Sequence, residues 1–241
     1  MILVAILLGL VAVLYGAAGQ AGGSGFVAVM TFAHFQSGDI RATAFALNIV
    51  AAAYAALQIH RAKLVNWKLL ALLLLTSIPA AAFGGMISLH GRVYFGVTGA
   101  ALLSIAGMML FRRTGTTGGT IPPIAALCVG AITGIVSGVT GVGGGVFLSS
   151  TLILVAKASP KDTFALSPPF ILANSIAALA GLMLAGQPFP MEALPLSGGV
   201  LVGSVAGFAI GLRWMTGNAI RAVLILILVT GGAQMLVRAT M

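Results

Sequence analysis

Acidic side chains are nearly absent from this sequence. Its 241 residues include 3 Asp or Glu against 12 Lys or Arg, and only 6% of the chain is charged. Asp39, Asp162 and Glu192 all fall near the ends of apolar segments. Ionisable residues that relay protons through a membrane protein lie inside its spans, so this distribution argues against a relay of carboxylates.

Cysteine is scarce as well. Cys128 stands alone in an apolar stretch, which excludes an intramolecular disulfide and a paired metal site and leaves packing as its expected role. No metal and no cofactor is expected. Basic stripes with interleaved aromatic residues are missing, so nucleic acid is not an expected partner. Residues 1–15 lack a basic region, and we do not interpret them as a cleaved signal peptide.

Apolar residues dominate instead, with 60% of the chain hydrophobic and a mean hydropathy of +1.15. Several segments approach or exceed the roughly 20 apolar residues that a helix needs to cross a bilayer. A transmembrane barrel would show short alternating segments. The sequence therefore predicts an all-α polytopic membrane protein, with long helices over residues 41–59, 69–89, 93–111, 163–185, 192–212 and 218–237.

Glycine interrupts two further apolar segments, at residues 16–25 and 137–145. A glycine costs about 1 kcal/mol relative to alanine inside a helix, so each run predicts a break between two short helices. Backbone groups freed at membrane depth are tolerated only where protein or a water-filled cavity satisfies them, which makes each break a candidate binding site. Close packing of helices through small residues is the alternative explanation. The short helices are expected over residues 1–15, 26–36, 124–136 and 146–156.

The two halves of the chain align at a shift of 119 residues. Under this shift Gly19, Gly22 and Gly25 meet Gly138, Gly141 and Gly144, and Asn48 meets Ser167. We interpret residues 1–112 and 122–241 as two transmembrane repeats joined by a linker at 113–121. Each repeat holds one broken element and three spans, a construction common in secondary transporters.

Each broken element either crosses the membrane or re-enters it, and Lys/Arg placement bears on the choice because these residues concentrate on the cytoplasmic side. Eight spans in parallel repeats divide the 12 Lys/Arg six to six between the two sides. Six spans with two re-entrant elements form inverted repeats, and this arrangement places nine of the Lys/Arg residues on one side of the membrane and three on the other. The bias favours the inverted arrangement, with both termini outside the cytoplasm and the breaks meeting near the midplane; the parallel arrangement stays open.

A small anion fits the chemistry of these breaks. Helix N-termini supply free amide hydrogens and a dipole of about +0.5 charge, and glycine lets the backbone approach the ligand closely. Asn48 and Ser167 occupy equivalent positions on the following spans, and nearby hydroxyl and amide groups add donors. The expected substrate-binding residues are Gly19, Gln20, Gly22, Ser24, Gly25, Asn48, Ser137, Gly138, Thr140, Gly141, Gly143, Gly144, Gly145 and Ser167.

The chain resembles the TauE/SafE sulfite-exporter family in residues 134–145 and in the later Ala165-Leu166-Ser167. It departs from that pattern in the first copy, which has Ser24 inside its glycine run, and after the second, where Phe147 to Ser150 stand in place of the usual proline. The resemblance implies an inner-membrane secondary transporter, an exporter of sulfite, sulfoacetate, thiosulfate or related anions and organic acids.

Other functions remain open from the residues alone. A passive anion channel or a carrier of other organic acids would use the same breaks, and a carrier could couple to protons through protonation of the anion. A membrane subunit serving a partner protein is a weaker possibility. An intramembrane serine protease is remote, because Ser24 would need a histidine partner and aligns with Gly143 in the repeat. We therefore expect no enzymatic activity; the oligomeric state is not predicted.

Overall fold

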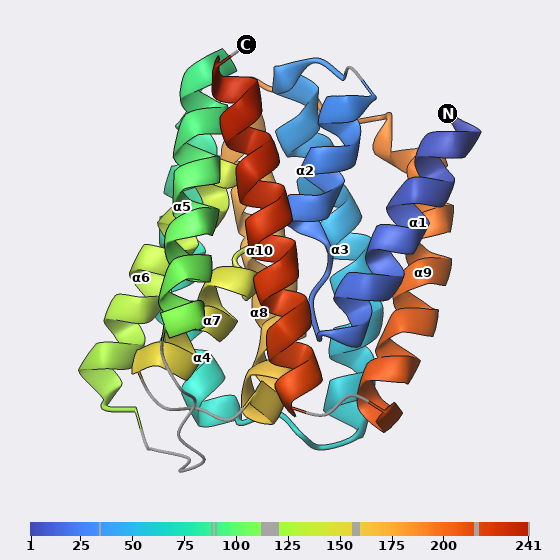
Figure 1. The fold of residues 1–241 in the computed structure, drawn as a ribbon. Helices are drawn as coiled ribbons and strands as arrows, with labels where there is room; N and C mark the ends of the chain where they lie inside the picture. Colours follow the sequence, from blue (N-terminus) through green and yellow to red (C-terminus); the bar gives the residue numbers. More distant parts are fainter. Residues whose placement is uncertain are drawn as a thin grey trace.

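The computed structural model describes residues 1–33, 35–87, 89, 91–111, 121–155, 160–214 and 217–240. This part of the chain is entirely helical apart from its connections, and it contains no strand. Figure 1 shows the helices packed as one bundle with both termini at the same end. The helices are α1 (Ile2–Ala17), α2 (Gly23–Phe32), α3 (Ser37–Arg61), α4 (Trp67–Met86), α5 (Gly91–Phe111), α6 (Pro123–Thr140), α7 (Gly145–Val155), α8 (Pro160–Leu184), α9 (Ala193–Trp214) and α10 (Gly217–Thr240).

Five helices of the described chain are long and apolar enough to cross a membrane, namely α3, α4, α6, α8 and α9. Large aliphatic side chains such as Ile2, Leu75 and Val202 are exposed on the outside of the bundle, as expected for a surface in contact with lipid rather than water. The all-α polytopic membrane fold predicted from the composition is confirmed.

The first broken element is a hairpin. α1 runs parallel to α9, since Gly9 lies against Gly199 and Gly203 while Gly16 lies against Gly207. α2 runs parallel to α10, because Gln234 and Arg238 donate hydrogen bonds to the carbonyls of Ala28 and Thr31. α9 and α10 run in opposite directions in Figure 1, so α2 returns toward the end of the bundle from which α1 enters.

The second broken element turns back from the opposite end of the bundle (Figure 1). α6 runs parallel to α4, with Gly130 against Leu73 and Gly138 against Ala81. α7 runs opposite to α8, since Gly145 lies against Ile171 while Ser149 contacts Ser167. Each broken element therefore packs its longer helix along a span of the other half of the chain, α1 on α9 and α6 on α4.

Glycine spacing explains how closely these helices approach. Gly199, Gly203, Gly207 and Gly211 recur every fourth residue on the face of α9 that meets α1, and Gly130, Gly134 and Gly138 do so on the face of α6 that meets α4. At each position a Cβ atom would lie within 3 Å of a backbone atom of the neighbouring helix. Small residues at four-residue spacing let membrane helices pack backbone to backbone.

The structure corrects several expected boundaries. The breaks are shorter than the glycine runs: residues 18–22 separate α1 from α2, and residues 141–144 separate α6 from α7. Ser137 to Thr140 continue α6, and Gly23 to Gly25 form the first turn of α2, because packing against neighbouring helices offsets the cost of glycine.

One further boundary also differs from the structure. α3 begins at Ser37, four residues before the expected start at residue 41. Cys128, for which a packing role was expected, lies exposed on α6. The predicted linker lies outside the described residues, apart from Ile121.

Candidate anion site between the two helix breaks

The first break bends at two glycines with positive φ, Gly19 at 72° and Gly22 at 124°. A side chain in this region of φ is strained, and glycine adopts it at no steric cost. The first hydrogen bond of α2 runs from the amide of Phe26 to the carbonyl of Gly22. The amides of Gly23, Ser24 and Gly25 precede this ladder and form the N-terminal end of the helix.

The second break contains three glycines with positive φ, Gly141 at 81°, Gly143 at 80° and Gly144 at 78°. Gly141 ends α6 in the left-handed conformation and donates its amide to the carbonyl of Ser137. The α7 ladder begins with the bond from Leu148 to Gly144, so the amides of residues 145–147 form its N-terminal end.

The two breaks touch each other inside the bundle. A Cβ atom on Gly23 would collide with the carbonyl of Val142 and would lie 2.7 Å from Nδ2 of Asn48. A Cβ atom on Gly143 would lie 2.8 Å from the same Nδ2. The side-chain amide of Asn48, near the middle of α3, thus lies between the N-terminal end of α2 and the second break. On the other side of the contact, Gly145 faces Oε1 of Gln20, which a Cβ atom would meet at 2.5 Å.

Four buried polar groups around this contact have an atom without a hydrogen-bond partner among the described residues. They are Oε1 of Gln20, Oδ1 of Asn48, Oγ of Ser137 and Oγ of Ser175. Their side chains are between 0% and 4% exposed. A buried polar group left unpaired costs about 1–3 kcal/mol, so four of them in one place make this contact a candidate site for a polar ligand.

Other predicted site residues have partners inside the protein. The Ser24 hydroxyl lies 2.7 Å from the Tyr15 hydroxyl, and Thr140 donates to the carbonyl of Val136 at 2.6 Å. Gln20 donates its amide to Ser149 at 2.9 Å. Ser149 contacts Ser167 at 2.7 Å, and Ser167 donates to the carbonyl of Thr163. This chain of hydrogen bonds joins the first break to α7 and α8 and occupies the Ser167 hydroxyl.

Two predicted site glycines have packing roles instead of forming a break. Gly138 lies inside α6 against Ala81, Gly84 and Gly85 of α4. Gly25 lies in the first turn of α2, where a Cβ atom would meet Val11 at 2.5 Å and Tyr15 at 2.9 Å. For these positions the alternative explanation, close packing through small residues, describes the geometry.

Sequence reasoning missed two residues near the site. Ser150 bonds the carbonyl four residues earlier at 2.7 Å, whereas Ser149 connects Gln20 with Ser167. Its position one turn after Gly145 was the available signal. The second is Arg41, which is 6% exposed and whose side-chain stem lies against Gly141. Only the tertiary contact between α3 and the end of α6 reveals this.

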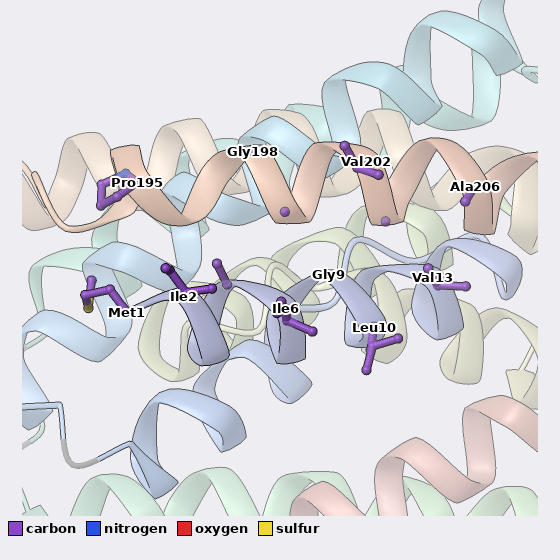
Figure 2. Close-up of a pocket in the computed structure, with 13 residues that line it drawn as sticks. Met1, Ile2, Ile6, Gly9, Leu10, Val13, Pro195, Gly198, Val202 and Ala206 are labelled. Carbon is purple, nitrogen blue, oxygen red and sulfur yellow. The ribbon is translucent and has the colours of Figure 1, made fainter.

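A separate groove runs along the outside of the bundle between α1 and α9 (Figure 2). Its volume is about 570 Å³, and its lining comes from apolar side chains and glycines such as Ile6, Gly9 and Val202. It presents no polar side chain that would orient a small anion, so the breaks remain the candidate site.

Interrupted helices with a buried polar contact between them are typical of membrane transporters, and comparisons with known proteins agree. The family model described as "Sulfite exporter TauE/SafE" matches residues 2–235. The "Probable membrane transporter protein y4hK" of Sinorhizobium fredii (strain NBRC 101917 / NGR234) is 34% identical over 232 residues, covering 94% of each chain. No solved structure matches.

This chain belongs to the TauE/SafE sulfite exporter family, as its motifs suggested. The family model and the relative both describe membrane transporters rather than enzymes, so the protease alternative is excluded. The Ser24 hydroxyl accordingly pairs with a tyrosine, which is not the histidine base of a serine protease.

Proposed function

We propose that the protein is an inner-membrane secondary transporter that exports small sulfur-containing anions such as sulfite, sulfoacetate or thiosulfate. The observation that carries the proposal is the contact of the N-terminal end of α2 with the second break, at one buried amide, Asn48. Free amide hydrogens and positive dipole ends are suited to an anion. The relative's printed name, a probable membrane transporter, supports transport and does not address the substrate.

In this proposal the anion binds between Gly23 and residues 143–145. Gly143 and Gly144 lack side chains and have positive φ, so the backbone can approach the ligand. Ser137, Ser175, Gln20 and Asn48 supply the polar side chains. A flip of the side-chain amide exchanges its oxygen and nitrogen. In the flipped orientation Gln20 and Asn48 present their NH₂ groups to the anion and give up their bonds to Ser149 and to the carbonyl of Gly141. The remaining predicted residues support the site: Gly19, Gly22, Ser24, Gly25, Gly138, Thr140, Gly141 and Ser167 shape the breaks and hold them in place.

We also propose that residues 1–112 and 122–241 are inverted repeats, connected by residues 113–121. Support comes from the matching packing of α1 on α9 and of α6 on α4, and from hairpins that enter from opposite ends of the bundle. In transporters built this way, one repeat moves against the other around a fixed site at the midplane. α6 is long enough to cross a membrane by itself, so length alone does not separate this arrangement from eight spans.

The proposed orientation has both termini outside the cytoplasm. Arg61, Lys63, Lys68 and Arg213 are exposed at the end of the bundle opposite the termini. At the end with the termini, Arg92 is exposed, while Arg41 and Arg238 donate to backbone carbonyls. Exposed positive residues concentrate on the cytoplasmic side of membrane proteins. Reaction of a cysteine placed at residue 63 with an impermeant reagent, in intact cells and in inverted vesicles of a Cys128→Ser background, tests the orientation.

Two other functions use the same site. A passive channel would conduct the anion without saturation, and a carrier of organic acids would prefer carboxylates. Coupling to protons would proceed through protonation of the anion, because Asp39 and Asp162 lie in first turns of helices and Glu192 just precedes one. A saturable flux in proteoliposomes that follows an imposed pH gradient would identify a proton-coupled carrier.

The first experiment is a thermal-shift screen of the purified chain against sulfite, thiosulfate, sulfate, sulfoacetate, taurine and simple carboxylates. A ligand that binds only the folded state raises its stability by about 2.7 kcal/mol at 100 times Kd. We expect at least one sulfur-containing anion to raise the melting temperature more than any carboxylate. Stabilisation by carboxylates alone would replace the proposed substrate class, and flux of the same anions in liposomes of the purified chain would show that no partner subunit is needed.

A further inference from the structure

Arg41 carries a buried positive charge beside the second break. It lies in the first turns of α3 and is 6% exposed. Its Nη1 donates to the carbonyl of Ile87 at 2.7 Å, and its Nη2 donates to the carbonyl of Gly85. Its Nε has no partner among the described residues. The described hydrogen bonds therefore hold the guanidinium with carbonyl oxygens, and no described carboxylate pairs with it.

Arg41 lies at the C-terminal ends of two helices. Gly85 and Ile87 flank the last residue of α4, and a Cβ atom on Gly141, the cap of α6, would lie 2.9 Å from Cγ of Arg41. Tyr94 adds a hydrogen bond of 2.5 Å to the carbonyl of Thr140, the last residue of α6. A helix C-terminus carries about −0.5 charge, and these two side chains compensate it.

This compensation matters because the end of one helix and the start of the next lie close together at a break, so a negative and a positive helix end are neighbours. Only residues 141–144 separate the negative end of α6 from the positive end of α7, so an anion there would meet repulsion as well as attraction. At the first break, the described hydrogen bonds onto the last turn of α1 come from the backbone amides of residues 18–20. The compensation by a buried cation is therefore a feature of the second break.

Arg41 also lies on the same face of α3 as Asn48, a residue of the proposed site. It precedes Asn48 by seven residues, which is two helical turns or about 10 Å along one face of α3. Coulomb attraction acts over this distance when the groups are shielded from water.

We propose that Arg41 makes the second break selective for anions and strengthens the binding of dianions more than that of monoanions. This inference rests on the proposed function, and it names the residue that sets the preference of the site for anions of higher charge.

The test measures Kd by calorimetry for thiosulfate, a dianion, and for methanesulfonate, a monoanion, on the purified full chain. In Arg41→Gln we expect about fivefold weaker binding of methanesulfonate and about 25-fold weaker binding of thiosulfate, because the Coulomb energy scales with the charge of the ligand. Arg41→Lys, which keeps the charge, retains the wild-type ratio of the two Kd values even where its melting temperature falls.

Arg238→Gln is the matched control. Arg238 also donates to a backbone carbonyl, that of Thr31 at 2.9 Å, but this carbonyl belongs to α2 rather than to the end of α4 or α6. The ratio of Kd values stays at the wild-type value in this variant. Equal weakening of both anions in Arg41→Gln, or loss of the ratio in Arg41→Lys, would overturn the inference and leave the proposed function intact. A wild-type chain that binds neither of these anions, nor sulfite or sulfoacetate, would overturn both.

Discussion

The two helix breaks align within the sequence repeat, yet their surroundings differ. At the first break, Ser24 pairs with Tyr15 and Gln20 donates to Ser149. At the second, Ser137, Ser175 and Asn48 keep unpaired atoms beside Gly143 and Gly144. Both breaks thus contain glycines with positive φ, while the buried polar atoms without a partner lie around the second break. This difference indicates that the second break makes most of the contacts to the ligand and that the first completes the site with Gln20 and the end of α2.

The largest effect is expected from Gly143→Ala. A side chain there is strained by about 1–2 kcal/mol at a φ of 80°, and its Cβ would lie 2.8 Å from Nδ2 of Asn48 and 3.2 Å from Oγ of Ser175. Displacing both groups should weaken anion binding by about two orders of magnitude, or about 2.7 kcal/mol, as measured by calorimetry.

The control for this substitution is Gly107→Ala on α5. A Cβ atom on Gly107 would meet no atom of the described chain within 4 Å, so this variant should bind like the wild type. Wild-type affinity in Gly143→Ala would exclude the second break as the site.

Asn48 and Ser167 test the asymmetry directly, since the repeat aligns them. Asn48→Ala should weaken binding by about 10–100-fold, because a hydrogen bond to a charged group contributes about 1.5–3 kcal/mol. Ser167→Ala should change Kd by less than about threefold, because its hydroxyl already donates to the carbonyl of Thr163. Comparable losses in the two variants would show that both halves of the site contact the ligand equally.

The connection between the breaks is tested by adjacent serines. Ser149→Ala removes the acceptor of the Gln20 amide and should lower the free energy of unfolding by about 1–2 kcal/mol. Ser150→Ala removes a hydroxyl bonded to the carbonyl of Val146 in its own helix and should cost less than about 0.5 kcal/mol. Thermal unfolding measures both, and the opposite order would contradict the connecting role of Ser149.

The smallest effects are expected from the two tyrosines. Tyr94→Phe frees the carbonyl of Thr140 at the second break and should weaken anion binding by about three- to fivefold. Tyr15→Phe removes the partner of Ser24 at the first break and should change Kd by less than about twofold. A larger loss of anion affinity in Tyr15→Phe than in Tyr94→Phe would show that the first break makes the main contacts to the ligand.

Much of the fold followed from sequence patterns. Long apolar runs predicted the spans within a few residues, as for α4 and α10, because hydrophobic length is a local property. The existence of both breaks was also predicted, but their lengths were overestimated. The ends of a break depend on what each glycine packs against, and Gly138 meets α4 through a contact that local sequence does not encode.

The sequence by itself determined that the chain is an all-α membrane protein, that two glycine runs interrupt its helices, and that it resembles one transporter family. Composition, spacing and motifs carry these properties. Only the tertiary structure decided that the breaks touch, that Asn48 lies between them, that Ser149 joins the halves and that Arg41 is buried beside Gly141. Each of these contacts joins residues far apart in the chain, and their proximity depends on how the helices pack.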